Sequence, residues 1–257
     1  MDIQLLTSLK ILIIGDYCKD IYKYGSVDRL SPEAPVPILN LVEEEVITDG
    51  MAGNVYNNIK ALNATASLVV SNKNILKIRY IDKKTKQHLL RVDHETACEE
   101  IKLDLKNINT YNAIVISDYD KGSIRPNTIN TILKHFNGVV FVDSKKKDLN
   151  VFKKCIIKIN EHENKSVIKF PNNSKIIVTL GENGALYNNK MFPTKKVEVF
   201  DVCGAGDSFM AGLSVQYLLT KNIEDAINFA NTCASNVVKK SGTSVLNFDE
   251  VKNDIRF

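Results

Sequence analysis

Two glycines and a carboxylate stand close together in Asp201–Phe209 (DVCGAGDSF), just before a stretch that we expect to be helical. Gly204 and Gly206 allow backbone N–H groups, with that of Ala205 between them, to turn toward one point, where the helix N-terminus adds partial positive charge. Such an anion hole suits a phosphoryl group in transfer. Asp207 is placed to take a proton from an attacking hydroxyl. A glycine-rich helix cap without chemistry explains the same residues equally well.

The elements around this segment alternate between short apolar runs and helical patterns. Six runs are largely apolar without a polar alternation, and we expect strands at Leu9–Gly15, Ser67–Val70, Ala113–Ser117, Val139–Val142, Ile156–Ile159 and Ile176–Leu180. Helical periodicity covers Gly53–Leu62, Asn127–Phe136, the residues after Gly206, and Ile223–Lys239. Strands buried on both faces are typical of a mostly parallel sheet covered by helices, an α/β fold in which ligands bind beyond the carboxyl ends of the strands.

Two further segments have the alternating pattern of half-exposed strands. Val36–Ile47 and Ile75–Val92 are rich in β-branched residues, and a polar turn at Asp82–Thr85 divides the second one. We expect antiparallel strands that are open to solvent on one side and form a small β lid beside the main sheet. The length of 257 residues fits a single domain, 1–257, with lid strands contributed by about 21–48 and 75–95.

Composition argues against several classes of protein. The net charge of +4 is not gathered in a dense basic stripe and Trp is absent, so we expect no nucleic-acid partner. No apolar run approaches the roughly 20 residues of a membrane span, and we recognise no signal peptide. Five cysteines without a C-x-x-C pair argue against a disulfide framework or a zinc site and favour the reducing cytoplasm. Neither a G-x-G-x-x-G after Gly15 nor a P-loop sequence occurs.

The segment Asp201–Asp207 resembles the D-T-x-G-A-G-D signature of the ribokinase/PfkB carbohydrate kinases, with Val202 in place of the usual Thr. The resemblance implies a ribokinase-like three-layer α/β/α fold, with a mostly parallel central sheet and a small β lid. It also implies that the chain transfers a phosphoryl group from ATP to a sugar hydroxyl. Asp207 would then be the catalytic base, and the backbone of residues 204–206 would hold the moving phosphoryl group.

A second family motif concerns the metal ion. Asn160–Glu163 (NEHE) is similar to the N-x-x-E motif, and the resemblance implies that Asn160 and Glu163 arrange Mg²⁺ and its waters near the phosphates. Hard oxygen ligands suit Mg²⁺. A surface turn is the alternative interpretation of so short a pattern. A monovalent cation is a further cofactor that the sequence leaves open.

Two later stretches resemble the parts of the family that surround ATP. Thr179–Gly184 is similar to the turn that borders the phosphates, and a hairpin turn is its alternative. Phe229–Ser244 resembles the helix and loop beside adenine and ribose, and an amphipathic core helix is its alternative. The nucleotide-binding candidates are Thr179, Gly181, Gly184, Asn231, Gly242 and Thr243.

The N-terminal half is most similar to the heptose-7-phosphate kinases of this family. Arg29–Pro37 (RLSPEAPVP) closely resembles their R-I-S-P-E-A-P-V-P stretch, although its composition alone indicates a polyproline-like connector into a lid strand. Further matches are Lys77–Glu95, Ser117–Gly122 and Asp143–Lys145. The resemblance implies phosphorylation of O1 of D-glycero-β-D-manno-heptose 7-phosphate in ADP-heptose synthesis. Those kinases are often fused to a nucleotidyltransferase domain, an activity that we expect to be absent because the chain ends at Phe257.

The same resemblance implies roles in binding the sugar and its phosphate. Asp20 and Asn54 would bind sugar hydroxyls, and Gly50 would let the backbone approach the ligand closely. Met51 interrupts the family's glycine pair, and we expect it to crowd or reshape the pocket. Arg29 belongs to the heptose-kinase stretch and is a further substrate-binding candidate. The candidates for the substrate phosphate are Arg79, Arg91 and Lys121. Each of them equally fits a surface charge on the lid.

One departure from the family follows Val70. Only Ser71–Asn74 separate Val70 from Ile75, whereas the related kinases carry roughly another helix–strand unit there. We expect a missing or rerouted sheet element, an altered wall of the sugar pocket, and an effect on the homodimer that this family often forms through the lid. Two alternatives therefore stay open: a kinase for another sugar or sugar phosphate, and a non-catalytic nucleotide- or sugar-binding relative.

Overall fold

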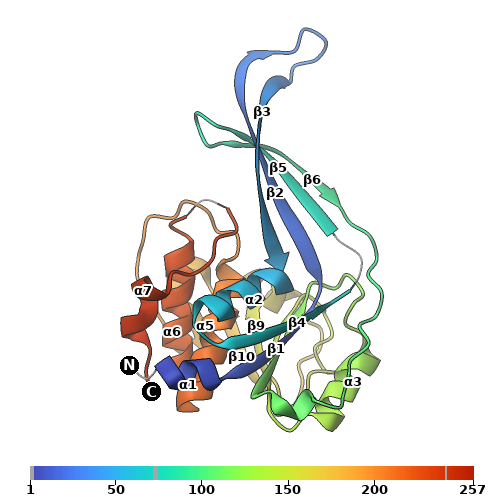
Figure 1. Cartoon of the computed structure of the whole chain (residues 1–257), viewed down its shortest axis with the longest axis vertical. Coiled ribbons are helices and arrows are strands. Elements are labelled where there is room, and N and C mark those ends of the chain that lie inside the picture. Colours follow the sequence, from blue (N-terminus) through green and yellow to red (C-terminus); the bar gives the residue numbers. More distant parts are fainter. Residues whose placement is uncertain (1–2, 72–74, 241) are drawn as a thin grey trace.

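The computed structural model describes residues 3–71, 75–240 and 242–257, which form two sheets and a set of helices around the larger sheet (Figure 1). The larger sheet has the strand order β12-β11-β10-β9-β8-β7-β1-β4. Its strands are β1 (Lys10–Gly15), β4 (Thr65–Val70), β7 (Ala113–Asp118), β8 (Val139–Ser144), β9 (Ile156–Asn160), β10 (Lys175–Thr179), β11 (Ala185–Tyr187) and β12 (Lys190–Phe192). In this sheet the neighbouring strands β4, β1, β7, β8, β9 and β10 are parallel. The last two strands, β11 and β12, continue the sheet in antiparallel pairing.

The central strands are apolar on both faces, as the sequence predicts for a parallel sheet. In β1, Ile11 and Ile13 pack into one hydrophobic core, whereas Leu12 and Ile14 pack into another on the opposite face. Because helices cover each of these faces, the predicted three-layer α/β/α arrangement is confirmed.

Most of the helices close the first core. They are α1 (Ile3–Ser8), α2 (Ala52–Ala61), α5 (Ala205–Thr220), α6 (Ile223–Val237) and α7 (Phe248–Val251). The second core is covered by α3 (Pro126–His135), and α4 (Glu161–Ser166) follows β9. Short 3₁₀ turns lie at Ile108–Thr110, Gly181–Asn183 and Lys252–Asp254. The side chain of Asn222 accepts hydrogen bonds from the N–H groups of Glu224 and Asp225 and so caps the N-terminus of α6.

The smaller sheet is the β lid, which rises from the body in Figure 1. Its strand order is β3-β2-β5-β6, with β2 (Tyr17–Leu30), β3 (Pro37–Met51), β5 (Ile75–Asp82) and β6 (His88–His94). The pairs β2–β3 and β5–β6 are antiparallel as predicted, but β2 and β5 pair in parallel. The stretch 29–37 forms the far end of the β2–β3 hairpin, where the Ser31 N–H donates to the Val36 carbonyl (2.9 Å).

The short connection after Val70 leaves β4 at the edge of the larger sheet. Within the described residues β4 pairs only with β1, and the next described element, β5, already belongs to the lid. Of the predicted short segment Ser71–Asn74, residues 72–74 lie outside the described residues. None of the helices in the described part of the chain combines the length and apolar character that a bilayer span requires.

Candidate active site

The candidate site lies beyond the carboxyl ends of β1, β7, β8 and β9, where parallel sheets bind ligands. Asp16 follows β1 and is fully buried. Its carboxylate accepts hydrogen bonds from the backbone N–H groups of Tyr119 (2.8 Å) and Lys121 (3.1 Å) and from the hydroxyl of Ser123 (2.6 Å). This carboxylate fixes the loop after β7 and thereby the position of Tyr119.

The turn that begins α5 provides the anion hole. Gly204 has a left-handed φ of 80°, and a Cβ there would lie 2.7 Å from Asn54 Nδ2, so this position requires glycine. The Ala205 N–H donates to a carbonyl of the same turn (3.3 Å). The N–H groups of Gly206 and Asp207 have no partner within the described residues. Two free N–H groups at the N-terminus of a long helix can therefore bind an anion.

Asp207 is buried, and two neutral donors hold its carboxylate. Asn54 Nδ2 donates to Oδ2 (2.9 Å), and the Tyr119 hydroxyl donates to Oδ1 (3.1 Å). Burial raises the pKa of Asp207 to about 6, even though the hydrogen bond from Asn54 favours the charged form. A carboxylate with this pKa is ionised at neutral pH and can accept a proton from a hydroxyl. The site therefore places a carboxylate that can serve as a base next to N–H groups that can bind an anion.

We expect removal of the Tyr119 hydroxyl to raise the pKa of Asp207 further, because this hydrogen bond stabilises the charged carboxylate. In the wild type, activity should fall as the pH drops through about 6, since a protonated Asp207 cannot accept a proton. In Tyr119→Phe this acid limb should move to higher pH by about one unit. The pH profile of kcat/KM tests both statements, and an unmoved limb would show that another group sets it.

A buried ion pair lies against the same turn. Lys158 on β9 and Asp143 on β8 are joined at 2.5 Å, with side chains only 5% and 6% exposed. Burial alone would lower the pKa of Lys158, but the neighbouring carboxylate outweighs burial and raises it. A Cβ on Gly206 would lie 2.9 Å from Lys158 Nζ, so the ammonium group adjoins the anion hole. Lys158 was not among the predicted site residues, although a lysine inside the apolar run IIKI is a signal of a buried partner.

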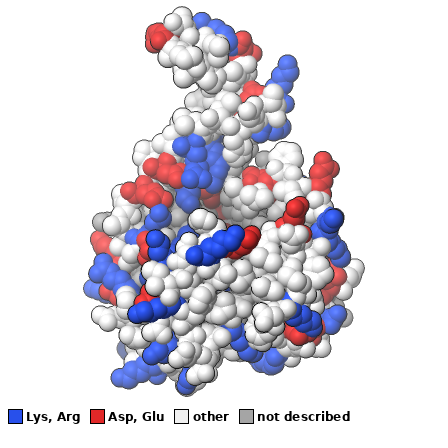
Figure 2. Space-filling view, turned by 180° about the vertical axis from the view of Figure 1, so that it is seen from behind, with Lys and Arg blue, Asp and Glu red and all other residues white. Residues whose placement is uncertain are grey.

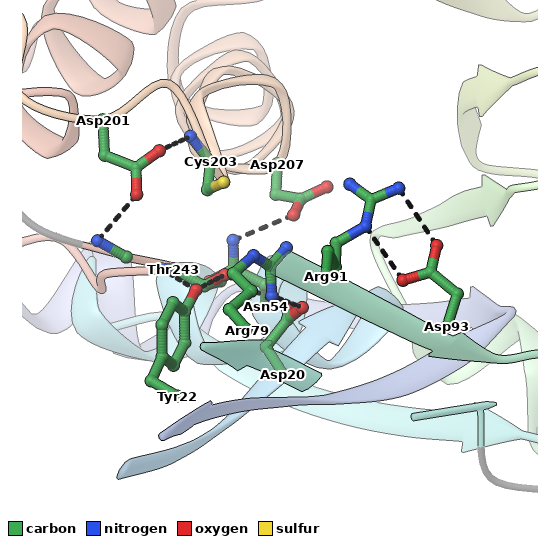
Figure 3. A network of polar contacts seen from close by, with 11 residues as sticks. Asp20, Tyr22, Asn54, Arg79, Arg91, Asp93, Asp201, Cys203, Asp207 and Thr243 are labelled. Carbon is green, nitrogen blue, oxygen red and sulfur yellow. Dashed lines mark hydrogen bonds and ion pairs between the residues drawn. The ribbon is translucent and has the colours of Figure 1, made fainter. Parts of the chain in front are cut away.

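The lid closes the site from the other side through Asp20 on β2 (Figure 3). Its Oδ1 accepts from Arg79 Nη1 (2.5 Å), and its Oδ2 accepts from the hydroxyl of Thr243 (3.1 Å). Gly50 leaves room for this carboxylate, because a Cβ there would collide with Asp20 Oδ2. The structure therefore brings Asp20, Gly50 and Asn54 together with the base. Arg79 is buried as the partner of Asp20, which already neutralises its charge.

The other basic residues predicted to bind the substrate either form ion pairs with carboxylates or lie far from the candidate site. Arg91 forms a two-pronged ion pair with Asp93 on the same strand (2.9 and 3.0 Å), and Lys121 pairs with Glu95 at 2.6 Å. Arg29 is exposed near the end of β2, where the lid is farthest from the body (Figure 1). The structure does not bring Arg29 to the site within one chain.

A cavity of about 410 Å³ opens next to the anion hole. The turn between β10 and β11, the segment 194–202 and helix α6 contribute its walls, and it reaches Ala205 and Gly206. The predicted nucleotide residues that line it are Thr179, Gly181, Gly184 and Asn231. Because the cavity ends at the anion hole, a nucleotide bound there would direct its phosphates toward the base.

The two remaining nucleotide candidates, Gly242 and Thr243, contact the lid and not this cavity. The Gly242 N–H donates to the Asp201 carboxylate (3.0 Å), and the Thr243 N–H donates to the hydroxyl of Tyr22 on β2 (2.7 Å). The hydroxyl of Thr243 also reaches Asp20. This loop therefore links the start of the Asp201–Asp207 segment to the lid.

The predicted metal residues form the N-terminus of α4. Asn160 Oδ1 accepts from the Glu163 N–H, and the Asn160 N–H donates to Glu163 Oε2, both at 2.8 Å, which makes a reciprocal capping box. Glu163 Oε1 has no partner within the described residues. Mg²⁺ takes one or two carboxylates and completes its shell with waters and phosphates, so one free carboxylate oxygen fits it. The described residues contain no group of three or more His, Cys, Asp or Glu that could hold a metal alone.

Met51 occupies a backbone position that favours glycine. Its φ of 55° and ψ of −129° lie in a strained region for a side-chain-bearing residue. The expected crowding of the sugar side is not seen, because the Met51 side chain packs with Cys18, Ile75 and Cys98 in a small apolar cluster. Tyr119 packs against this cluster, so Met51 forms part of the apolar support of Tyr119.

The arrangement can move a phosphoryl group from a nucleotide to a small hydroxyl compound, because the anion hole adjoins both the base and the cavity. Fold and site are thus those of a small-molecule kinase. Residues 55–249 match the pfkB family of carbohydrate kinases, and the chain belongs to this family. It is an ATP-dependent sugar kinase.

Within the family, the chain is similar to curated proteins called HldE. The bifunctional protein HldE of Sulfurimonas denitrificans is 32% identical over 95% of this chain, that of Helicobacter acinonychis 32% over 94%, and that of Nitratiruptor sp. 31% over 95%. The chain spans 63% to 65% of the length of these relatives. The alignment with the first extends over 305 positions, more than the chain's 257 residues, so that relative carries segments that this chain lacks.

Solved structures share the fold at low sequence identity. Phosphofructokinase-2 from Escherichia coli in complex with potassium superposes with a TM-score of 0.74 at 15% identity, over 96% of this chain and 98% of that one. Ribokinase from Arabidopsis thaliana complexed with ribose and ATP gives 0.69 at 16%, over 97% and 99%. Ribokinase from Thermotoga maritima gives 0.67 at 18%, over 96% and 99%. These likenesses confirm the predicted ribokinase-like fold.

Proposed function

We propose that the protein transfers the γ-phosphoryl group of ATP to O1 of D-glycero-β-D-manno-heptose 7-phosphate, a step of ADP-heptose synthesis. The observation that carries the chemistry is Asp207, a buried carboxylate with a pKa of about 6 beside two free N–H groups of α5. The choice of sugar is supported by the resemblance of Arg29–Pro37 and Lys77–Glu95 to the heptose-7-phosphate kinases, and by the similarity to the HldE proteins.

In the proposed reaction, Asp207 takes the proton of the acceptor hydroxyl while the oxygen of that hydroxyl bonds to the γ-phosphorus of ATP. The bond from this phosphorus to the bridging oxygen breaks in line, and the electron pair leaves with ADP. The N–H groups of Gly206 and Asp207 stabilise the charge on the transferred group, and Lys158 adds a positive charge beside them. Asn160 and Glu163 would hold Mg²⁺, which supplies neutralisation of charge on the β- and γ-phosphates.

ADP release with Mg-ATP across a panel of sugars and sugar phosphates tests this proposal. Turnover is expected with heptose 7-phosphate and not with ribose, fructose or fructose 6-phosphate. Parallel assays in potassium and sodium salts show whether a monovalent cation takes part. Turnover of a different sugar would keep the kinase but overturn the heptose assignment. ATP binding without ADP formation on any acceptor would instead identify a non-catalytic binding protein.

We also propose that two copies associate through the lid. β3 is an edge strand of the lid sheet, and its residues Leu41, Val46 and Ile47 are 53%, 42% and 49% exposed. Apolar side chains on an exposed strand favour pairing with a second copy. Sedimentation should show a dimer for the wild type and a monomer for Leu41→Lys/Val46→Lys. Ile168→Lys, on the body and also exposed, is the matched control. A wild type that sediments as a monomer at micromolar concentration would contradict the proposal.

A cytoplasmic location is the last part of the proposal. The donor is ATP, and Cys18, Cys155, Cys203 and Cys233 form no disulfide within the described residues, although three of these four are buried. Unpaired thiols of this kind are typical of reducing compartments. Fractionation of the native cells, with the protein detected by antibody, should recover it with the cytoplasmic marker enzymes, and recovery from an oxidising compartment would refute this part.

A further inference from the structure

Basic side chains gather beside a hollow where the lid meets the body (Figure 2). The three residues predicted to bind a substrate phosphate are each held by a carboxylate: Arg79, Arg91 and Lys121. A paired cation must give up its partner before it can bind a phosphate fully. Cations without such a partner are therefore the stronger candidates for an anion site.

Lys77 and Lys145 form no ion pair with any described residue, and they come from different parts of the fold. Lys77 lies on β5 of the lid, and Lys145 directly follows β8 of the body. Their Nζ atoms lie 5.7 Å and 4.2 Å from the ring centre of Tyr119. The hydroxyl of this same ring donates to Asp207 (3.1 Å). One aromatic ring therefore separates the two ammonium groups from the catalytic base.

The pairing of the lid strands explains why Lys77 has no carboxylate of its own. On β5, Lys77 stands between Asp20 on β2 and Asp93 on β6. Arg79 binds the first of these carboxylates and Arg91 binds the second. Of these five charged side chains, Lys77 alone forms no ion pair in the described part of the chain. An unmatched cation in a cleft of otherwise paired charges indicates an anion that arrives from outside.

On the body side, Lys145 is exposed. The two carboxylates whose charge raises its pKa, Glu163 and Asp143, each have another partner. Asp143 is paired with Lys158 at 2.5 Å, and Glu163 accepts the Asn160 N–H at 2.8 Å. Within the described residues Lys145 forms no ion pair. It can therefore turn toward a ligand in the cleft without breaking one.

We infer that Lys77 and Lys145 together bind the phosphate group of a phosphorylated sugar acceptor, so that one phosphate bridges the lid and the body. The inference rests on the proposed sugar kinase function and assigns residues to its acceptor. The phosphates of the nucleotide offer the same chemistry. However, the cavity that adjoins the anion hole is lined entirely by body residues and includes neither lysine, which favours the acceptor. An acceptor held in this way would span from the two lysines to Asp207.

The test compares Lys77→Ala and Lys145→Ala with the matched control Lys60→Ala. Lys60 also lies over a tyrosine ring, that of Tyr56 at 5.3 Å, but on α2 away from the cleft. For heptose 7-phosphate, each cleft variant should lower kcat/KM by about 10-fold to 100-fold, mainly through KM, as for a lost hydrogen bond to a charged group. The KM for ATP and the kcat/KM for the same heptose without its phosphate should not change. Lysine-to-arginine variants should recover part of the loss.

Each outcome separates this inference from the proposed function. If kcat/KM fell equally for the heptose with and without its phosphate, or if the KM for ATP rose, the assignment of the two lysines to the acceptor would be wrong. The proposed kinase activity would not be affected by either result. Should the wild type phosphorylate no sugar, the proposed function fails, and calorimetric titration with heptose 7-phosphate decides the inference alone. Binding that the cleft variants lose would support it. Binding that they retain, or no binding by the wild type, would refute it.

Discussion

Replacement of Asp207 by asparagine should lower kcat by about 100-fold to 10,000-fold, the range for loss of a general base. The amide cannot accept the hydroxyl proton. Its single oxygen can still accept the hydrogen bond from Asn54, and its NH2 group can donate to the Tyr119 hydroxyl in place of the second hydrogen bond. Binding of a non-hydrolysable ATP analogue, measured by calorimetry, should therefore stay near the wild-type value. Asp225→Asn, which alters an exposed pair on α6, is the matched control. A turnover near that of the wild type would remove Asp207 from the role of base.

The same substitution should stabilise the protein at alkaline pH. The pKa of Asp207 is about 6 in the folded chain, above the roughly 4 of an unfolded aspartate. Stability is therefore lost as the pH rises from about 4 through about 6, because the folded state disfavours the charged carboxylate. Asparagine does not ionise, so at pH 8 Asp207→Asn should gain up to about 3 kcal/mol of unfolding free energy, and much less at pH 5. Urea unfolding at the two pH values measures this difference.

Lys158→Met should damage both stability and turnover. The substitution leaves Asp143 buried without its cation, which costs about 3–5 kcal/mol of unfolding free energy. It also removes the positive charge beside Gly206, and we expect kcat to fall by about 100-fold or more. Urea unfolding and steady-state kinetics measure the two effects independently.

A second substitution separates these two effects. In Lys158→Met/Asp143→Leu the whole pair is apolar, and such replacements often cost little stability. The double variant should therefore regain most of the unfolding free energy while its turnover stays low. If turnover returned together with stability, the ion pair would be only a structural feature.

The elements that the sequence predicted well carry their signal locally. The apolar run Leu9–Gly15 and the periodic segment Ile223–Lys239 indicate their structures without distant partners, and the structure has β1 and α6 there. The segment Asp201–Asp207 likewise holds the glycine turn and the carboxylate within seven residues. Its chemistry could be argued before the fold was known, although the pKa of Asp207 depends on burial that only the fold supplies.

The rest depended on pairings between distant residues. The sequence placed lid strands at about 21–48 but gave no bounds for β2. Its buried row includes Asp20 and Tyr22 and its outer row includes lysines, so it lacks the apolar alternation of a strand. Arg79 is neutralised by Asp20 because β2 pairs with β5, and no local sequence pattern indicates this pairing. For the same reason the sequence indicated neither the partner of Lys158 nor the unmatched charge of Lys77.

The strand order also shows how this kinase tolerates a shorter chain. The strands β1, β7, β8 and β9, whose carboxyl ends carry the site, are interior to the sheet, whereas β4 is a border strand. A unit missing after Val70 would trim that border and leave β1, β7, β8 and β9 with neighbours on both sides. The residues of the candidate site therefore keep their positions when the sheet is shortened at this border. Evolution or engineering could therefore shorten a kinase of this family from that border inward, as long as the interior strands are kept.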